Sequence, residues 1–198
     1  MICRFSQGWM VAAVLGVAFA APASQAGMIP TNVTVAADGG NFRWTYAVVV
    51  TTDVKVNPGD SFTIYDFGGL VANSISAPTG WTISQAKITP GRPGTNPHDD
   101  PTIPDLTFTY TGSTPIQGQQ GLGNFWAVSQ YNKTDSSDLT SSTHRQVDGR
   151  LENNITSTDV PKAGSPIQGT PEPGTLILLG AGLPILGLVR YARSRKKK

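Results

Sequence analysis

No segment between residues 27 and 170 carries the 3.6-residue spacing of apolar side chains that indicates an amphipathic helix. Short apolar runs are instead separated by turn residues, in a chain with 22 glycines and 15 prolines. The clearest run covers residues 41–52, where Phe42, Trp44 and Tyr46 alternate with polar residues before a β-branched stretch. This pattern is typical of β-strands, so we predict an all-β fold.

About seven short strands bounded by turn signals predict a single antiparallel β-sandwich, either immunoglobulin-like or jelly-roll in type. We place this extracytoplasmic domain at residues 27–156. A type II turn is predicted at residues 57–60, because proline and glycine occupy its two central positions. The expected strands are residues 41–52, 61–67, 70–76, 81–88, 106–111 and 124–130, with a weaker candidate at 154–158.

Three segments are expected to lie outside the strands. Residues 89–104 contain five prolines and are predicted to form a long surface loop. Residues 132–150 are dense in Ser, Thr and Asp and are predicted to be a second, mobile connection. Residues 157–170 are predicted to be a linker.

The N-terminus has the three regions of a secretory signal peptide. Arg4 supplies a positive charge, residues 9–21 form a short apolar run, and small residues precede Ala26. We expect export by the Sec machinery and removal of residues 1–26 by signal peptidase, with cleavage after Ala23 as the second choice. An uncleaved anchor helix is the alternative. Cys3, the only cysteine, precedes the apolar run, so the mature chain is expected to have no disulfide and no cysteine metal ligand.

The C-terminus combines a short apolar run with a cluster of cations. Residues 174–189 are uncharged, and a helix of this length reaches about 24 Å, less than the roughly 30 Å of a hydrocarbon core. The positive-inside rule predicts a single transmembrane helix with the basic tail, residues 190–198, in the cytoplasm and the domain outside. A buried core helix would fit the apolar run but not the cations after it. These cations are Arg190, Arg193, Arg195, Lys196, Lys197 and Lys198.

The formal net charge of +2 arises from this tail. Residues 27–170 hold eight Lys and Arg against twelve Asp and Glu, so the exported domain is mildly acidic. We therefore expect no nucleic-acid partner.

Pro171, Glu172 and Pro173 stand directly before the apolar run. With that run and the basic terminus, they resemble the PEP-CTERM sorting signal of Gram-negative bacteria that make extracellular polysaccharide. The resemblance covers residues 171–198. It implies recognition by exosortase, a multi-pass membrane enzyme, with cutting near the motif and release or re-attachment at the cell surface or in the matrix. The two prolines also favour an extended backbone, which suits a protease cleft. An ordinary single-pass anchor is the alternative.

Residues 27–170 contain no recognised catalytic motif, so we expect no catalytic residues, no enzyme activity and no cofactor. His98 and His144 are placed in polar loops, and their spacing does not predict a Ser-His-Asp triad. Asp66 and Asp105 are considered as paired carboxylates for glycoside hydrolysis. Their positions at strand ends favour a structural role.

Two kinds of binding site are also considered. Asp99, Asp100 and Asp105, after His98, are weak calcium candidates. They lack the regular acidic spacing of calcium loops, so solvated loop acids are favoured and no metal is expected.

The mature chain has three tryptophans. Trp44 and Trp126 lie within strand patterns and are expected in the core. Trp81 is expected to be the exposed tryptophan and is the candidate for stacking on a sugar.

The sequence therefore predicts an exported, non-enzymatic β-sandwich of the cell surface or exopolysaccharide matrix. Its expected partners are the Sec machinery, signal peptidase, an exosortase-type enzyme and extracellular polysaccharide. A carbohydrate-binding or adhesin-like module is the first alternative, and an extracellular hydrolase with an unrecognised site is the second.

Overall fold

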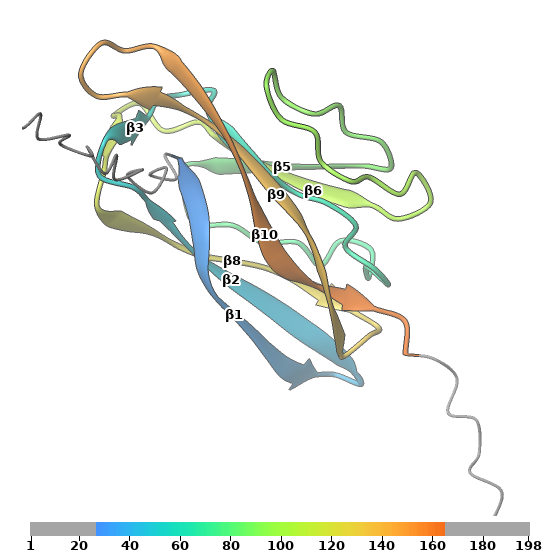
Figure 1. The fold of residues 1–198 in the computed structure, drawn as a ribbon. Helices are drawn as coiled ribbons and strands as arrows, with labels where there is room; N and C mark the ends of the chain where they lie inside the picture. The colour runs from blue at the N-terminus through green and yellow to red at the C-terminus, as the bar shows by residue number, and fades with distance from the viewer. Residues whose placement is uncertain (1–26, 165–198) are drawn as a thin grey trace, which may run out of the picture.

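The computed structural model describes residues 27–164, and this part of the chain is all-β without a helix. The prediction of an all-β fold is therefore confirmed. Ten strands follow one another along the chain (Figure 1). They are β1 (Met28–Asp38), β2 (Asn41–Val50), β3 (Val54–Val56), β4 (Ser61–Ile64), β5 (Trp81–Ala86), β6 (Asp105–Tyr110), β7 (Ile116–Gln117), β8 (Gln120–Ser129), β9 (Lys133–Arg145) and β10 (Leu151–Lys162).

The strands form two antiparallel sheets that pack together like a sandwich. The smaller one, sheet A, has the order β1-β2-β8. The larger one, sheet B, has the order β5-β6-β4-β9-β3-β7, and β10 pairs with β9 beside this path. The long β9–β10 hairpin runs diagonally across the view in Figure 1, and β1 lies beside it.

The core is built from side chains that alternate along the strands of both sheets. In β2, Trp44, Tyr46 and Val48 are buried while their neighbours are partly exposed, as the period-2 pattern predicts. Phe125 of β8 meets Phe62 of β4 edge to face, with 4.9 Å between the ring centroids. Phe62 also stacks on Phe108 of β6 at 5.0 Å. The Phe62–Phe125 contact joins the two sheets through apolar packing, and residues 27–164 contain no cysteine.

The turn at residues 57–60 has the predicted form. The Asp60 N–H donates to the Asn57 carbonyl at 3.0 Å, and Gly59 has φ 94°. A type II turn needs a positive φ at its third position, which glycine adopts without steric cost. The turn leads directly into β4.

The prediction of a mobile connection at residues 132–150 is wrong, because β9 occupies most of this segment. β9 pairs with β10 from Lys133↔Lys162 to His144↔Leu151, and with β4 from Leu139↔Ile64 to Ser142↔Ser61. The segment has no proline to interrupt these ladders. Leu139 and Ser141 are fully buried, and the Ser141 hydroxyl accepts a bond from the Met28 N–H at 3.1 Å.

Other boundaries and strands also differ from the prediction. β10 runs to Lys162, so the domain boundary expected at 156 and the start of the expected linker at 157 both fall inside a strand. β1 was not among the predicted strands. Residues 70–76 were, but they make only isolated bridges to β8, at Leu70↔Ser129 and Ser76↔Trp126.

The β5–β6 loop, residues 87–104, is irregular as its prolines predict, and it is docked on sheet B. Arg92 Nη2 donates to Ser61 Oγ of β4 at 2.9 Å, and Asn153 Nδ2 of β10 donates to the Pro93 carbonyl at 3.0 Å. The His98 N–H donates to Asp138 Oδ2 of β9 at 2.7 Å. Figure 1 shows this loop in green beside β5 and β6. These contacts fix the position of the acids that the loop carries.

Candidate functional site

Three acidic side chains meet where the β5–β6 loop returns to sheet B. Asp66 lies just after β4, Asp99 lies in the loop, and Asp105 is the first residue of β6. One carboxylate oxygen from each lies within 4.8 Å of the other two. Asp66 and Asp99 are half-buried, and Asp105 has 0% of its surface exposed. We refer to these three residues as the acidic cluster.

Backbone hydrogen bonds hold Asp66 from both sides. The Tyr65 N–H donates to the Asp138 carbonyl at 3.0 Å, and the Phe67 N–H donates to the Pro104 carbonyl at 2.8 Å. Between them, Asp66 has φ 57°, a left-handed conformation that Asp tolerates better than most residues. Its own N–H donates to Asp105 Oδ1 at 3.1 Å. The sheet and the loop thus bring these two carboxylates together.

The carboxylates are only partly satisfied by hydrogen bonds. Asp66 accepts from the Asp100 N–H at 2.9 Å and from the Ser137 hydroxyl at 3.2 Å, and Asp99 Oδ2 accepts from the Thr89 N–H at 3.0 Å. Asp99 Oδ1 and Asp105 Oδ2 are buried without a partner. Within residues 27–164, no Lys, Arg or His forms an ion pair with any of the three acids. Buried polar atoms are normally paired, so these two oxygens need an explanation.

Burial raises the pKa of two members of the cluster above the usual aspartate value. For Asp105 the main cause is burial, and the negative charges of Asp99 and Asp66 add to it. The Asp66 N–H and the nearby Thr89 hydroxyl oppose part of this rise, although that hydroxyl has no well-aligned hydrogen bond. Burial likewise raises the pKa of Asp66, with Asp99 and Asp100 contributing in the same direction. Both shifts mean that the charged form is poorly stabilised here.

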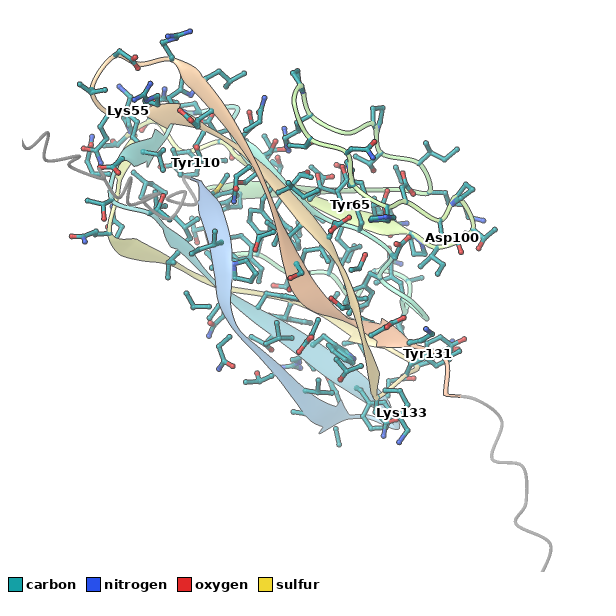
Figure 2. All side chains as sticks on the ribbon, in the orientation of Figure 1. Lys55, Tyr65, Asp100, Tyr110, Tyr131 and Lys133 are labelled. Carbon is teal, nitrogen blue, oxygen red and sulfur yellow. The ribbon has the colours of Figure 1, made fainter. Side chains whose placement is uncertain are left out.

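An open cavity of about 570 Å³ lies beside the cluster and shares Asp66 with it. Its walls come from the loop end near Pro104, from Tyr131, and from Val160 to Ala163 at the end of β10. Figure 2 shows Asp100 and Tyr131 on this side of the molecule. Asp66 therefore links a buried group of acids to a solvent-accessible space.

Sequence reasoning found two of the three members as calcium candidates. The structure brings Asp99 and Asp105 together, but the Asp100 carboxylate accepts bonds from its own neighbour, Thr102, at 2.9 Å from the N–H and 2.7 Å from the hydroxyl. These bonds lower the pKa of Asp100. Asp66 takes the place expected for Asp100. In the sequence, Asp66 and Asp105 are paired as possible carboxylates for glycoside hydrolysis. That pairing is the sequence signal that pointed to Asp66.

The two histidines do not form a catalytic triad with any described residue. His98 is exposed, and its Nδ1 lies 3.2 Å from Asp138 Oδ2. The expectation that His144 lies in a loop is wrong: it lies in β9, with Nδ1 3.0 Å from Asp60 Oδ2. Within residues 27–164, no serine hydroxyl forms a hydrogen bond with either ring.

The tryptophans are arranged differently from the prediction. Trp44 is fully buried, as expected. Trp126 faces away from the core, and the Arg43 guanidinium lies 4.4 Å above its ring. Trp81, expected to be exposed, is half-buried, with ring centroids 5.0 Å from Phe125 and 5.3 Å from Tyr110. It packs against the edge of the core.

The sorting residues Pro171, Glu172 and Pro173, the apolar run at 174–189 and the basic cluster lie outside the described residues, as does the predicted signal peptide. Among residues 27–164, no helix is long and apolar enough to cross a membrane.

No protein-family model matches the chain, and a search among curated proteins finds no relative.

Proposed function

We propose that this chain is an exported, non-enzymatic β-sandwich protein of the cell surface or exopolysaccharide matrix, sorted and processed by an exosortase-type enzyme. The observation that carries the proposal is the order of elements in the sequence. A signal peptide comes first, a β domain follows, and Pro171, Glu172 and Pro173 precede a short apolar run and six cations at the C-terminus.

The N-terminal end of the β domain supports the proposed boundary between the signal peptide and the domain. The Gly27 N–H donates to Thr51 Oγ1 at 2.9 Å, and Met28 is fully buried as the first residue of β1. Gly27 and Met28, the first two residues after the predicted cleavage position, are therefore part of the folded body. Sequencing of the mature N-terminus should yield Gly27.

The C-terminal end of the β domain supports the proposed boundary between the domain and the sorting signal. β10 ends at Lys162, and the eight residues 163–170 separate it from the sorting motif. A chain of this length spans at most about 28 Å. The folded body would then lie close to the membrane surface while the motif is presented to a membrane enzyme.

Two observations argue against glycoside hydrolysis by the Asp66–Asp105 pair and against a sugar platform at Trp81. Asp105 has no exposed surface, so a glycosidic bond cannot lie beside it as hydrolysis by the Asp66–Asp105 pair would require. Trp81 is packed among other aromatic rings, which leaves little of its ring for stacking on a sugar. A structural or binding role at the surface remains the proposal.

A transfer experiment tests the sorting function. Residues 163–198 are fused to the C-terminus of an unrelated exported reporter in a strain that has an exosortase. We expect the fusion to be cut near the motif and the reporter to reach the same location as the native chain. Glu172→Ala in the fusion should reduce cutting, because it removes the charge placed between the two prolines.

The matched control is the reporter fused to the same segment with all six terminal cations kept and Pro171, Glu172 and Pro173 replaced by alanine. This control should insert but remain uncut. Equal processing of the control and the native segment, or processing in a strain without exosortase, would contradict the proposal.

A further inference from the structure

We propose that Asp66, Asp99 and Asp105 bind one calcium ion, which fastens the β5–β6 loop to sheet B. The inference does not depend on how the chain is sorted, and it concerns the folded body alone.

The carboxylate oxygens of the acidic cluster lie at distances that one ion can bridge. Three carboxylate oxygens, one from each residue, lie within 4.8 Å of one another. Calcium binds oxygen at about 2.3–2.6 Å, so two ligands of one ion can stand up to about 5 Å apart. Magnesium, with bonds of about 2.0–2.1 Å in strict octahedral geometry, requires a closer and more regular set. The spacing is therefore compatible with three ligands of one calcium ion.

Two of the three acids have a buried carboxylate oxygen without a well-aligned hydrogen bond. Asp105 has 0% exposed surface, and its Oδ2 has no well-aligned hydrogen bond, although the Thr89 hydroxyl lies nearby. The other oxygen, Oδ1, accepts the Asp66 N–H, so the unpaired one belongs to a carboxylate that is held in place. Asp99 Oδ1 is also buried and unpaired. A buried carboxylate oxygen without a donor is costly, and a cation would satisfy both.

The negative charge of the acidic cluster is not balanced by an ion pair within residues 27–164. Three aspartates meet in one place, and no cationic side chain within residues 27–164 forms an ion pair with them. The guanidinium of Arg92, in the same loop as Asp99, donates to Ser61 instead. One divalent ion would reduce the charge of the cluster from −3 to −1. Water and backbone carbonyls would complete the six to eight oxygens that calcium takes.

The ion would connect three parts of the fold. Asp66 follows β4, Asp99 lies in the loop, and Asp105 begins β6. Asp66 also accepts a bond from Ser137 of β9, so the central strands of sheet B are linked to the loop through it. Extracellular calcium modules bind the ion at about 10⁻⁴–10⁻³ M, so we expect binding at about millimolar calcium.

A proton shared between carboxylates is the alternative way to relieve repulsion within the acidic cluster. Melting the protein with and without calcium distinguishes a bound calcium ion from a shared proton. The full-length chain is purified in detergent and melted in EDTA, in about 1 mM calcium chloride and in about 1 mM magnesium chloride. We expect calcium to raise the Tm by about 3–10 °C and magnesium to raise it less. Calorimetric titration should give one calcium ion per chain. Hydrogen exchange at residues 89–104 should slow in calcium.

Asp66→Asn and Asp99→Asn should each abolish the calcium-dependent rise. Asparagine keeps the size of the side chain, and at position 66 it also tolerates the left-handed backbone. In EDTA, Asp66→Asn should melt at or above the wild-type temperature, because one repelling charge is removed. Asp100→Asn is the matched control, since its carboxylate bonds Thr102 outside the cluster, and it should keep the full response.

The absence of a calcium-dependent rise in the wild-type chain would overturn the proposal. So would a full rise in both Asp66→Asn and Asp99→Asn, or its loss in Asp100→Asn. An equal response to magnesium would overturn the choice of calcium.

Discussion

Residues 89–104 and residues 132–150 are alike in composition, since both are polar and have few large apolar side chains. In the structure the first is a docked loop, whereas the second contains β9, which pairs with β4 and β3 on one side and β10 on the other. The two segments also touch, through the His98 N–H and the Asp138 carboxylate.

The difference between them lies in the backbone. Residues 89–104 contain five prolines, each of which lacks the N–H that a ladder needs, and residues 132–150 contain none. β9 has Ser and Thr at buried positions, where their small side chains and their hydroxyls fit between neighbouring strands. Ser141 shows this, because it is fully buried and accepts the Met28 N–H. A strand can therefore be polar if every backbone donor has a partner.

A proline substitution should reveal the largest difference in stability between residues 132–150 and residues 89–104. Ser141→Pro places the ring in the centre of β9, opposite Phe62 and Asn154, and we expect a loss of more than about 3 kcal/mol, with little folded protein remaining. Asn96→Pro in the exposed part of the loop should change the Tm only slightly. Thermal unfolding by circular dichroism measures both. A stable Ser141→Pro variant would show that β9 does not hold sheet B together.

Truncation of an apolar side chain should also cost more free energy of unfolding in β9 than in the loop. The difference should be smaller than that between the two proline variants. Leu139 of β9 is fully buried, so Leu139→Ala should lower the free energy of unfolding by about 2–5 kcal/mol. Ile103 of the loop is half-buried, and Ile103→Ala should cost less than half as much. Urea denaturation gives both values. Equal losses would mean that the loop contributes as much to the core as the strand does.

The polar docking of the loop should have the smallest effect. Arg92→Ala removes the bond to Ser61 Oγ, and we expect a loss of about 1 kcal/mol in the free energy of unfolding. The exchange of amide hydrogens should increase in residues 89–104 and stay unchanged in β9. Faster exchange throughout β9 would contradict the view that the strand is stable without the loop.

The sequence predicted the fold where apolar residues alternate and failed where they do not. Trp44 and Tyr46 follow the pleat of β2, so their burial follows from the pattern. The inward positions of β9 are largely Ser and Thr, and this strand depends on pairing with residues far away in the chain. β1 has mostly exposed or half-exposed side chains and was missed for the same reason.

The acidic cluster was predictable in part. Asp99 and Asp105 are close in sequence, and their loop composition pointed to oxygen ligands. Whether Asp99 or Asp100 faces inward depends on the path of the loop, which is set by the bond from the Asp100 N–H to Asp66. Such a long-range contact has no local signal.

The central claim is that a folded body is joined to a tail that serves only for sorting. The most direct test is the intact mass of the exported chain, purified from producing strains with and without an exosortase. The account predicts a chain that begins at Gly27 in both strains and that ends near Pro171 to Pro173 only where the enzyme is present. A C-terminus at Lys198 in both strains would contradict it.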